Sequence, residues 1–229
     1  GDGQIRMEPG PAEFWSRSTE VYQNPRFQPP PAVLKTRCLV PLSLLVDPVP
    51  KSLTFGPISG AHLNPAVTLA DAIEHGIPWS EAVVYMLVQC AGGVAGAIIA
   101  HLMFGLHWYS FSSHSRHGWA LVLSEFVATF GLLSVIWGCS RLRSGVVPFA
   151  VATYITAAYW FTASTSFANP AVTIARSLSD TFAGIRPSDV PLFIVAQLAG
   201  ALTATFLFRW LVPNLPLHAD EVLIPHSHS

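Results

Sequence analysis

Long apolar stretches separated by short polar segments make up most of the chain after residue 80. Four of these stretches hold about 18–23 residues each, with few polar interruptions, and lie at 82–104, 119–139, 146–163 and 190–212. About 20 helical residues, rising ~1.5 Å each, cross the ~30 Å hydrocarbon core of a bilayer. Because too little polar chain remains to cover such stretches in a soluble protein, the pattern predicts four membrane-spanning helices.

Two shorter segments, 65–74 and 170–182, are too short to span a bilayer. Each begins with Pro and is preceded by an Asn, Asn64 in one case and Asn169 in the other. Asn is a favoured helix N-cap and Pro a favoured first helical residue, so each segment predicts the start of a short helix. Irregular backbone at membrane depth is tolerated only where it is buried in protein or lines a cavity. Both segments are therefore candidate parts of a functional site.

The pentapeptide Asn-Pro-Ala-Val-Thr occurs twice, at 64–68 and at 169–173. The similarity continues downstream, where each copy is followed by a Gln inside a predicted spanning helix, Gln89 and Gln197. Internal duplication is the better account of this match. Three predicted crossings separate the two copies, and an odd number gives the two halves opposite orientations in the membrane. The N-termini of the two short helices are then expected to meet near the midplane.

Composition agrees with a membrane protein. Charged residues make up 11% of the 229 residues, hydrophobic residues 51%, and the mean hydropathy is +0.45. The net charge of -1 gives no reason to expect a nucleic-acid partner. Arg141 and Arg143 lie in the short connection 140–145, which the positive-inside rule places in the cytoplasm. The same topology places the C-terminal tail, 214–229, in the cytoplasm.

The segment 59–68, which reads SGAHLNPAVT, resembles the first pore loop of the major intrinsic proteins, the aquaporin family, and Asn-Pro-Ala at 169–171 resembles the second. The resemblance implies an all-α transmembrane fold, an aquaporin-like inverted repeat with six spanning helices and two half-helices around one pore, and a homotetramer. It also implies an integral protein of the bacterial inner membrane. The implied half-helix caps are Pro65, Ala66, Pro170 and Ala171.

The resemblance divides the chain into an aquaporin-like channel domain, 53–213, with a first half at 53–104 and a second half at 119–213. Residues 1–52 do not belong to the pattern, because prolines interrupt them and no segment is long enough to span. We therefore expect four of the usual six spanning helices, with two missing. Two accounts stay open: a channel whose first two helices are missing, or a truncated, non-conducting membrane subunit of the same family.

The two Asn-Pro segments predict how a pore would select. Each half-helix N-terminus carries a partial positive charge, so two of them meeting head to head repel cations and protons. Asn64 and Asn169 can each offer a side-chain N–H to a solute while the side-chain carbonyl caps the helix. The lipid bilayer and small neutral solutes are thus the predicted partners, and ions are rejected.

Glu125 is a carboxylate inside a predicted spanning helix, which is costly and indicates function. It resembles the family's buried Glu, which accepts hydrogen bonds and braces a pore loop. Gln89 and Gln197 fit the same bracing role. A carboxylate on the transport path is the alternative.

The chain differs from most members of the family at positions that determine the selectivity of the pore. Val172 follows the second Asn-Pro-Ala, at a position where most family members carry Arg, and Ser166 and Ala157 take two other positions of the constriction. A constriction lined by these three side chains is wide and weakly polar. The sequence Asn-Pro-Ala-Val at this place resembles that of bacterial aquaglyceroporins associated with arsenic resistance. Water, glycerol, urea and neutral arsenicals such as arsenite trihydroxide are the expected solutes. Alternatively, Arg176, one turn further on, reaches back and restores a donor.

The remaining polar residues suggest no catalysis and no cofactor. Four histidines between residues 101 and 117 lack a fixed ligand spacing with Cys or carboxylate, so we expect no metal site. Nothing resembles a nucleophile with its base or a phosphate-binding loop, so we expect no enzyme. An intramembrane enzyme is kept as a remote alternative.

Overall fold

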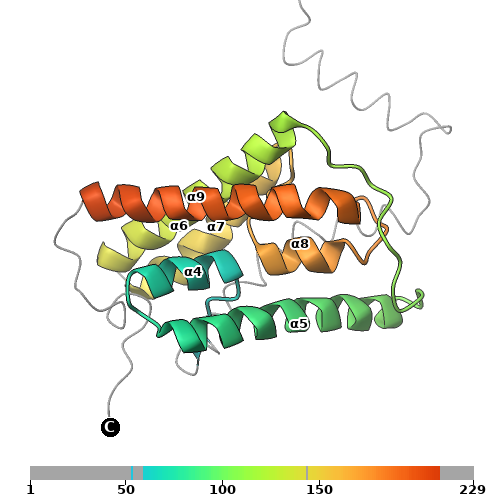
Figure 1. Ribbon diagram of the computed structural model, residues 1–229, viewed down its shortest axis with the longest axis horizontal. Coiled ribbons are helices and arrows are strands. Elements are labelled where there is room, and N and C mark those ends of the chain that lie inside the picture. Colours follow the sequence, from blue (N-terminus) through green and yellow to red (C-terminus); the bar gives the residue numbers. More distant parts are fainter. Residues whose placement is uncertain (1–52, 54–58, 143, 212–229) are drawn as a thin grey trace, which may run out of the picture. The chain divides into compact units, whose positions relative to one another are not determined.

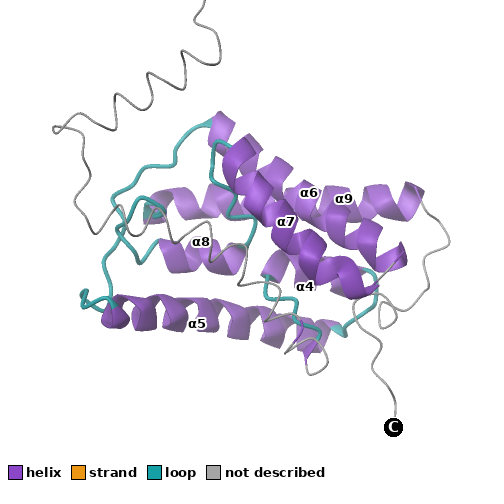
Figure 2. Ribbon diagram, turned by 180° about the vertical axis from the view of Figure 1, so that it is seen from behind, coloured by secondary structure: helices purple, strands orange, loops and turns teal. Residues whose placement is uncertain are grey.

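The computed structural model describes residues 53, 59–142 and 144–211, and the regular secondary structure of these residues is entirely helical (Figures 1 and 2). The helices are α4 (Pro65–Ile73), α5 (Trp79–Met103), α6 (Trp119–Leu142), α7 (Val147–Phe161), α8 (Pro170–Arg176) and α9 (Val190–Leu211), with single 3-10 turns η1 (Ser144–Val146) and η2 (Pro187–Asp189). The predicted all-α transmembrane class is confirmed. The predictions for residues 1–52 and for the tail 214–229 lie outside the described residues.

Three of the described helices are long and apolar enough to cross a membrane: Trp79–Met103, Trp119–Ser140 and Pro187–Leu211. The sequence predicts four, and the fourth, α7, is shorter than its predicted range of 146–163. It has 15 residues, or about 22 Å at 1.5 Å per residue. Pro148 lies in its first turn, directly after a 3-10 turn, and Thr162 ends the helix in an extended conformation.

The two short helices lie between α5 and α9, with their N-terminal ends toward each other (Figure 1). Helix α4 agrees with its predicted range, but α8 ends at Arg176 and not at residue 182. The carbonyls of Ser177 and Leu178 accept hydrogen bonds from the backbone N–H groups of Ser112 and Ser110, at 2.9 and 3.0 Å. Because a loop from elsewhere in the chain takes these carbonyls, the helix does not continue.

Helices α6 and α9 form the centre of the fold, and small residues let them approach closely. A Cβ atom added at Gly200 of α9 would lie 2.4 Å from the Phe126 carbonyl oxygen of α6. The core beside this contact contains Ala128, Leu132, Leu133 and Trp137 of α6 with Ala201 and Ala204 of α9. Helix α5 lies against α8 in the same manner, because a Cβ at Gly93 would be 3.2 Å from the Ala171 carbonyl oxygen.

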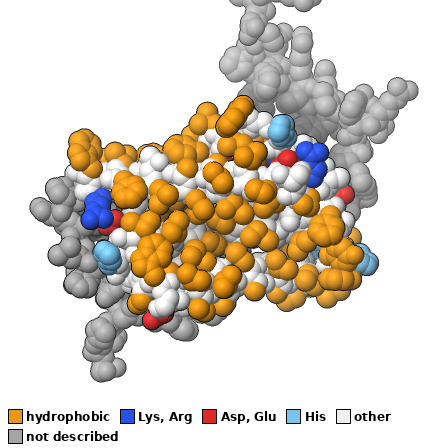
Figure 3. Space-filling model, viewed as in Figure 1, with side chains coloured by type: hydrophobic (Ala, Val, Ile, Leu, Met, Phe, Trp, Pro, Cys, Tyr) orange, Lys and Arg blue, Asp and Glu red, His pale blue; other side chains and the backbone are white. Residues whose placement is uncertain are grey.

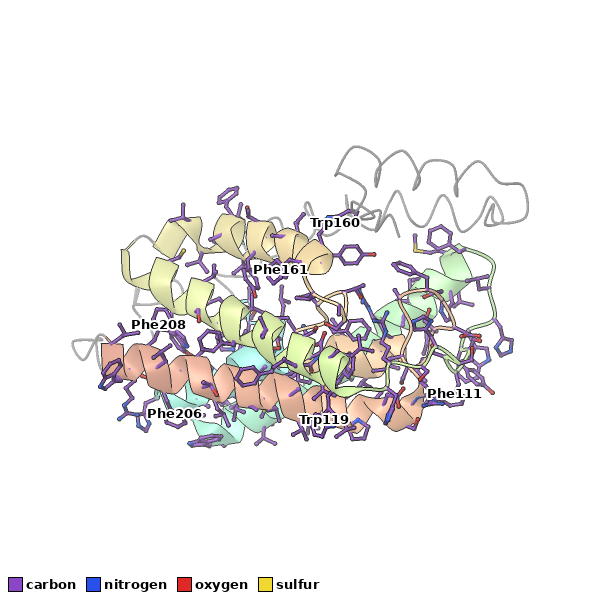
Figure 4. The ribbon with its side chains drawn as sticks, turned by 90° about the horizontal axis from the view of Figure 1, so that it is seen from above. Phe111, Trp119, Trp160, Phe161, Phe206 and Phe208 are labelled. Carbon is purple, nitrogen blue, oxygen red and sulfur yellow. The ribbon has the colours of Figure 1, made fainter. Side chains whose placement is uncertain are left out.

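The outside of the described fold is apolar. Figure 3 shows hydrophobic side chains over most of one face, with the charged and histidine side chains gathered at its two ends. Two strongly exposed tryptophans lie at helix ends: Trp119 begins α6, and Trp160 precedes the last residue of α7 (Figure 4). Such a surface fits a hydrocarbon environment with aromatic residues at its interfaces.

Candidate pore loops

The two Asn residues of the repeated motif bind each other's loops. The Nδ2 atom of Asn64 donates a hydrogen bond to the Ala168 carbonyl oxygen at 2.8 Å, and Nδ2 of Asn169 donates to the Leu63 carbonyl oxygen at 2.9 Å. The exchange is reciprocal, because each acceptor directly precedes the opposite Asn. A primary amide has two N–H groups, so each Asn has a second donor besides this one.

The amide oxygens of the same two residues cap the short helices. Asn64 Oδ1 accepts from the Ala66 N–H at 2.9 Å, and Asn169 Oδ1 accepts from Ala171 and Val172 at 3.0 and 3.4 Å. Both Asn residues are N-caps with extended backbone, and Pro occupies the first turn after each. Capping fixes the amide plane, and this sets the direction in which the remaining N–H points.

The backbone before each Asn adopts conformations that L-residues avoid. Positive φ angles occur at Ala61 and Leu63 in the first loop and at Thr165, Ser166 and Ala168 in the second. A non-glycine residue in this region costs about 1–3 kcal/mol and persists where the surrounding structure over-determines it, often at functional sites. The two loops are therefore strained in the same way and must be held by other contacts.

Glu125 of α6 holds the second loop. Its carboxylate is fully buried and accepts hydrogen bonds from the backbone N–H groups of Phe167 and Ala168, at 2.8 and 2.9 Å. Gln197 of α9 donates to the same carboxylate at 2.6 Å. Both oxygens are thus engaged by protein donors, and the bracing role of Glu125 stays a prediction.

A Gln–Thr contact recurs in both halves of the repeat. Gln89 Nε2 donates to Thr68 Oγ1 at 3.0 Å, and Gln197 Nε2 donates to Thr173 Oγ1 at 2.8 Å. The two threonines are the last residues of the repeated pentapeptide, yet the sequence reasoning gave them no role. Their duplication at the same distance from Asn was the signal that could have identified them.

The first loop has a contact of its own that the sequence reasoning did not assign. The His62 ring lies 3.2 Å from Thr68 Oγ1 through Nδ1 and 3.5 Å from the Asp71 carboxylate through Nε2. His62 therefore links the strained loop to two residues of α4. Its position two residues before Asn64 gave no indication of this pairing with Asp71.

The three residues predicted to form the constriction lie in different environments. Ser166 is buried in the second loop, and Val172 is half-buried in the first turn of α8. Ala157 has an exposed side chain on α7. Ser166 and Val172 thus lie close in the chain around Asn169, and the assignment of all three residues to one constriction stays a prediction.

Arg116 is the main residue of this region that the sequence analysis did not identify. It comes from the loop between α5 and α6, and its guanidinium is buried and donates to three carbonyl oxygens: Gly184 at 2.7 Å, Ser164 at 2.7 Å and Phe182 at 3.2 Å. Burial lowers the pKa of Arg116, and the negative charge of Glu125 opposes this shift. A lone arginine in an otherwise uncharged loop was the available signal.

Arg116 and Arg176 both lie against one aromatic ring. The guanidinium carbon of Arg116 is 4.7 Å from the centroid of the Phe167 ring, and that of Arg176 is 4.4 Å from it. The electron-rich face of an aromatic ring attracts such cations. The second loop is therefore flanked by two positive charges, with the Glu125 carboxylate bound to the backbone of the same residue, Phe167.

Within the described residues, no group of three or more His, Cys, Asp or Glu side chains is placed to hold a metal ion. His101 is buried and contacts the Ser179 hydroxyl at 2.9 Å and the His107 carbonyl oxygen at 3.0 Å. The contact with Ser179 attaches the end of α5 to the segment after α8.

Comparison with known proteins gives a match over most of the chain. A family model described as "Major intrinsic protein" matches in two segments, residues 49–148 and 140–228.

Three individual proteins are similar to this chain. Aquaglyceroporin AqpS of Rhizobium meliloti is 52% identical over 163 residues, which cover 71% of this chain and 70% of that protein. The glycerol uptake facilitator protein of Bacillus subtilis is 36% identical over 44% of this chain and 42% of that protein. Aquaporin NIP1-4 of Oryza sativa is 33% identical over 67% of this chain and 57% of its own length.

Proposed function

The chain belongs to the major intrinsic protein family, and on this premise we propose that it is a passive transmembrane channel for water and small neutral solutes. As a member of this family of channels it is not an enzyme. The observation that carries the proposal is the reciprocal binding of Asn64 and Asn169 to each other's loops. This arrangement brings two capped helix starts and two amide groups to one place in an integral membrane protein.

In the proposed pore, each Asn uses one N–H for the opposite loop and offers the second N–H to the solute. A neutral solute with an acceptor oxygen exchanges a hydrogen bond with water for one with the amide, so its dehydration is offset. A cation finds no carboxylate in this part of the proposed path, because both oxygens of Glu125 accept protein N–H groups. Passage of neutral solutes is thus favoured over passage of ions.

Glu125, Gln89 and Gln197 are proposed to brace the pore loops. The carboxylate satisfies two backbone donors in a strained loop, and the two Gln side chains fix a threonine in each half. Buried polar networks rigidify a structure when their members are satisfied. Bracing is favoured over a transport-path role for Glu125, because its carboxylate is fully buried.

The constriction is proposed to consist of Val172, Ser166 and Ala157, which is wide enough for solutes larger than water. Two relatives support this reading by name, one as an aquaglyceroporin and one as a glycerol uptake facilitator. Glycerol, urea and neutral arsenicals such as arsenite trihydroxide are the proposed solutes. We further propose a homotetramer in a bacterial inner membrane, with a cytoplasmic C-terminus.

Stopped-flow light scattering on proteoliposomes tests the channel. Vesicles with the wild-type chain are expected to reswell under inward glycerol, urea or arsenite gradients faster than empty vesicles. Asn169→Asp replaces the donor amide by a carboxylate of the same shape and is expected to lower the reswelling rate to that of empty vesicles. Thr203→Val is the matched control, because Thr203 is exposed on α9 and bonds only to its own helix in the described structure.

Wild-type rates equal to those of empty vesicles would overturn the channel proposal. That result would favour a non-conducting membrane subunit of the same family. Equal rates for wild type and Asn169→Asp, both above empty vesicles, would place the transport path elsewhere.

A further inference from the structure

The loop that follows α5 exposes a row of large apolar side chains. Met103 and Phe104 are 78% and 72% exposed in the described fold, and Phe111 is 62% exposed. The full row consists of Met103, Phe104, Leu106, Trp108, Tyr109 and Phe111. Contiguous exposed apolar side chains mark contacts with a protein, a ligand or a membrane. The loop is therefore a candidate interaction surface.

Backbone hydrogen bonds hold this loop in place. The N–H of Ser110 donates to the Leu178 carbonyl oxygen at 3.0 Å, and the N–H of Ser112 donates to that of Ser177 at 2.9 Å. The Ser112 side chain is buried, whereas the neighbouring Phe111 is exposed. The contacts with the end of α8 thus fix which side chains of the loop point away from the protein.

The aromatic rings of the row also contact one another. The ring centroids of Trp108 and Tyr109 lie 4.3 Å apart, and those of Tyr109 and Phe111 lie 5.6 Å apart, both edge to face. Aromatic pairs favour this arrangement. Because the rings are already ordered on the surface, a partner that binds them loses little affinity to side-chain ordering.

The charge pattern indicates what kind of partner this is. The chain between Glu81 and Arg116 contains no Asp, Glu, Lys or Arg, and this run includes the loop as well as nearly all of α5. The segment 179–189, which forms hydrogen bonds with the same loop, carries two aspartates and an arginine. Of two neighbouring segments, one thus has the composition of a loop in water and the other does not.

The length of α5 gives the depth of the loop. The helix has 25 residues, or about 37 Å, whereas the hydrocarbon core is only ~30 Å thick. The end of a spanning α5 and the loop after it therefore lie at the level of the lipid headgroups. Ile99 and Leu102 in the last turns of α5 are also exposed, and hydrophobic side chains cover the face over α5 as far as this end (Figures 1 and 3). The aromatic row continues the surface that faces the bilayer.

We propose that residues 103–111 form an interfacial anchor, a loop that binds the lipid headgroup layer at the C-terminal end of α5. Trp and Tyr suit this layer because the ring lies among the acyl chains while the N–H or O–H stays with polar groups. The Trp108 indole N–H and the Tyr109 hydroxyl donate to lipid ester or phosphate oxygens, and the Phe104 and Phe111 rings lie among the first methylene groups. Lipid is favoured over a second copy of this chain, because the row continues the bilayer-facing side of α5 without a charged residue.

The interfacial anchor goes beyond the proposed channel function and does not depend on which solute passes. The same loop binds the C-terminal end of α8 through Ser110 and Ser112. The anchor therefore attaches this end of the second half-helix to the lipid surface.

Spin labels in vesicles of phosphatidylcholine and phosphatidylglycerol test the depth of the loop. Leu106→Cys, Phe111→Cys and Ser115→Cys are each labelled in a whole chain whose three native cysteines are replaced by Ser. Oxygen, which concentrates among acyl chains, and a water-soluble nickel chelate serve as collision partners. The ratio of oxygen to nickel collisions at residues 106 and 111 is expected to exceed that at residue 115 several-fold. Ser115 is the matched control, because it is exposed in the same loop outside the apolar row.

Two results would overturn the anchor. Nickel collisions at residues 106 and 111 as frequent as at residue 115 would place the loop in water. Infrequent collisions with both reagents would show that protein covers the loop, and a second copy of the chain would then replace lipid as the partner.

A measurement on the chain with its native cysteines decides if a labelled variant fails to reconstitute. The difference in tryptophan emission between wild type and Trp108→Phe isolates Trp108, and the substitution keeps an aromatic ring. This difference emission is expected to be quenched by lipids brominated near the headgroup and much less by acrylamide in the water. Stronger quenching by acrylamide, or quenching by neither reagent, would contradict the proposal.

Discussion

Arg116 donates a hydrogen bond from Nη1 to the carbonyl oxygen of Ser164 at 2.7 Å, across 48 residues of chain. The contact ties the loop between α5 and α6 to the loop that leads into α8. Because the guanidinium is buried and donates to two further carbonyls, it also fixes the segment between α8 and α9. The strained second pore loop is thus held by Arg116 through the Ser164 carbonyl and by Glu125 through the N–H groups of Phe167 and Ala168.

Replacing Arg116 should destabilise the protein strongly. Arg116→Gln leaves at least two buried carbonyl oxygens without a donor, and we expect a loss of about 3 kcal/mol or more. The thermal midpoint of the detergent-solubilised protein measures this loss. Arg186→Gln, which removes an exposed arginine, should change the midpoint little. An unchanged midpoint in Arg116→Gln would show that the three contacts contribute little to stability.

Replacing Glu125 should release the second pore loop. Glu125→Gln presents an NH2 group where one oxygen now accepts a backbone N–H, so two donors face each other. We expect a loss of about 2–4 kcal/mol and a lower solute permeability in proteoliposomes. Ser124→Ala, the neighbouring position on α6, is the control. Normal stability and permeability in Glu125→Gln would contradict the bracing role.

A side chain at Gly200 should separate α6 from α9. Gly200→Ala places a Cβ at 2.4 Å from the Phe126 carbonyl oxygen, too close for any Cβ to remain without a backbone shift. We expect a loss of about 1–3 kcal/mol, measured as the thermal midpoint. Gly96→Ala is the control, because a Cβ there meets nothing within 4 Å among the described residues. Equal midpoints for the two variants would argue against the close helix contact.

The loop between α5 and α6 should loosen in acid. The backbone N–H and the hydroxyl of Ser113 hold the pKa of Asp180 below its usual range. A carboxyl whose pKa is lowered by folding stabilises the fold above its unfolded pKa, about 3.9, and this stabilisation is lost as the pH falls through the folded value. Hydrogen exchange at residues 110–114 should therefore rise below about pH 4. In Asp180→Asn this rise should be absent, and a rise of the same size would assign it to another group.

Much of the architecture could be predicted from the sequence because it depends on local signals. The spans follow from runs of apolar residues, and the starts of α4 and α8 follow from Asn-Pro. The reciprocal approach of Asn64 and Asn169 follows from the duplicated motif and an odd number of crossings. The end of α8 at Arg176 could not be predicted in this way, because it is set by amide groups of residues 110 and 112.

The sequence by itself determined the class of the protein, the membrane spans α5, α6 and α9, the two capped half-helices and the family. Each rests on composition, periodicity or a motif, and these are readable without knowing which segments meet. Tertiary structure alone decided the two arginines on the Phe167 ring and the pairing of Arg116 with the Ser164 carbonyl. Those contacts join loops far apart in the chain through hydrogen bonds to backbone atoms. Every residue carries the same backbone acceptor, so the sequence holds no sign of which one is chosen.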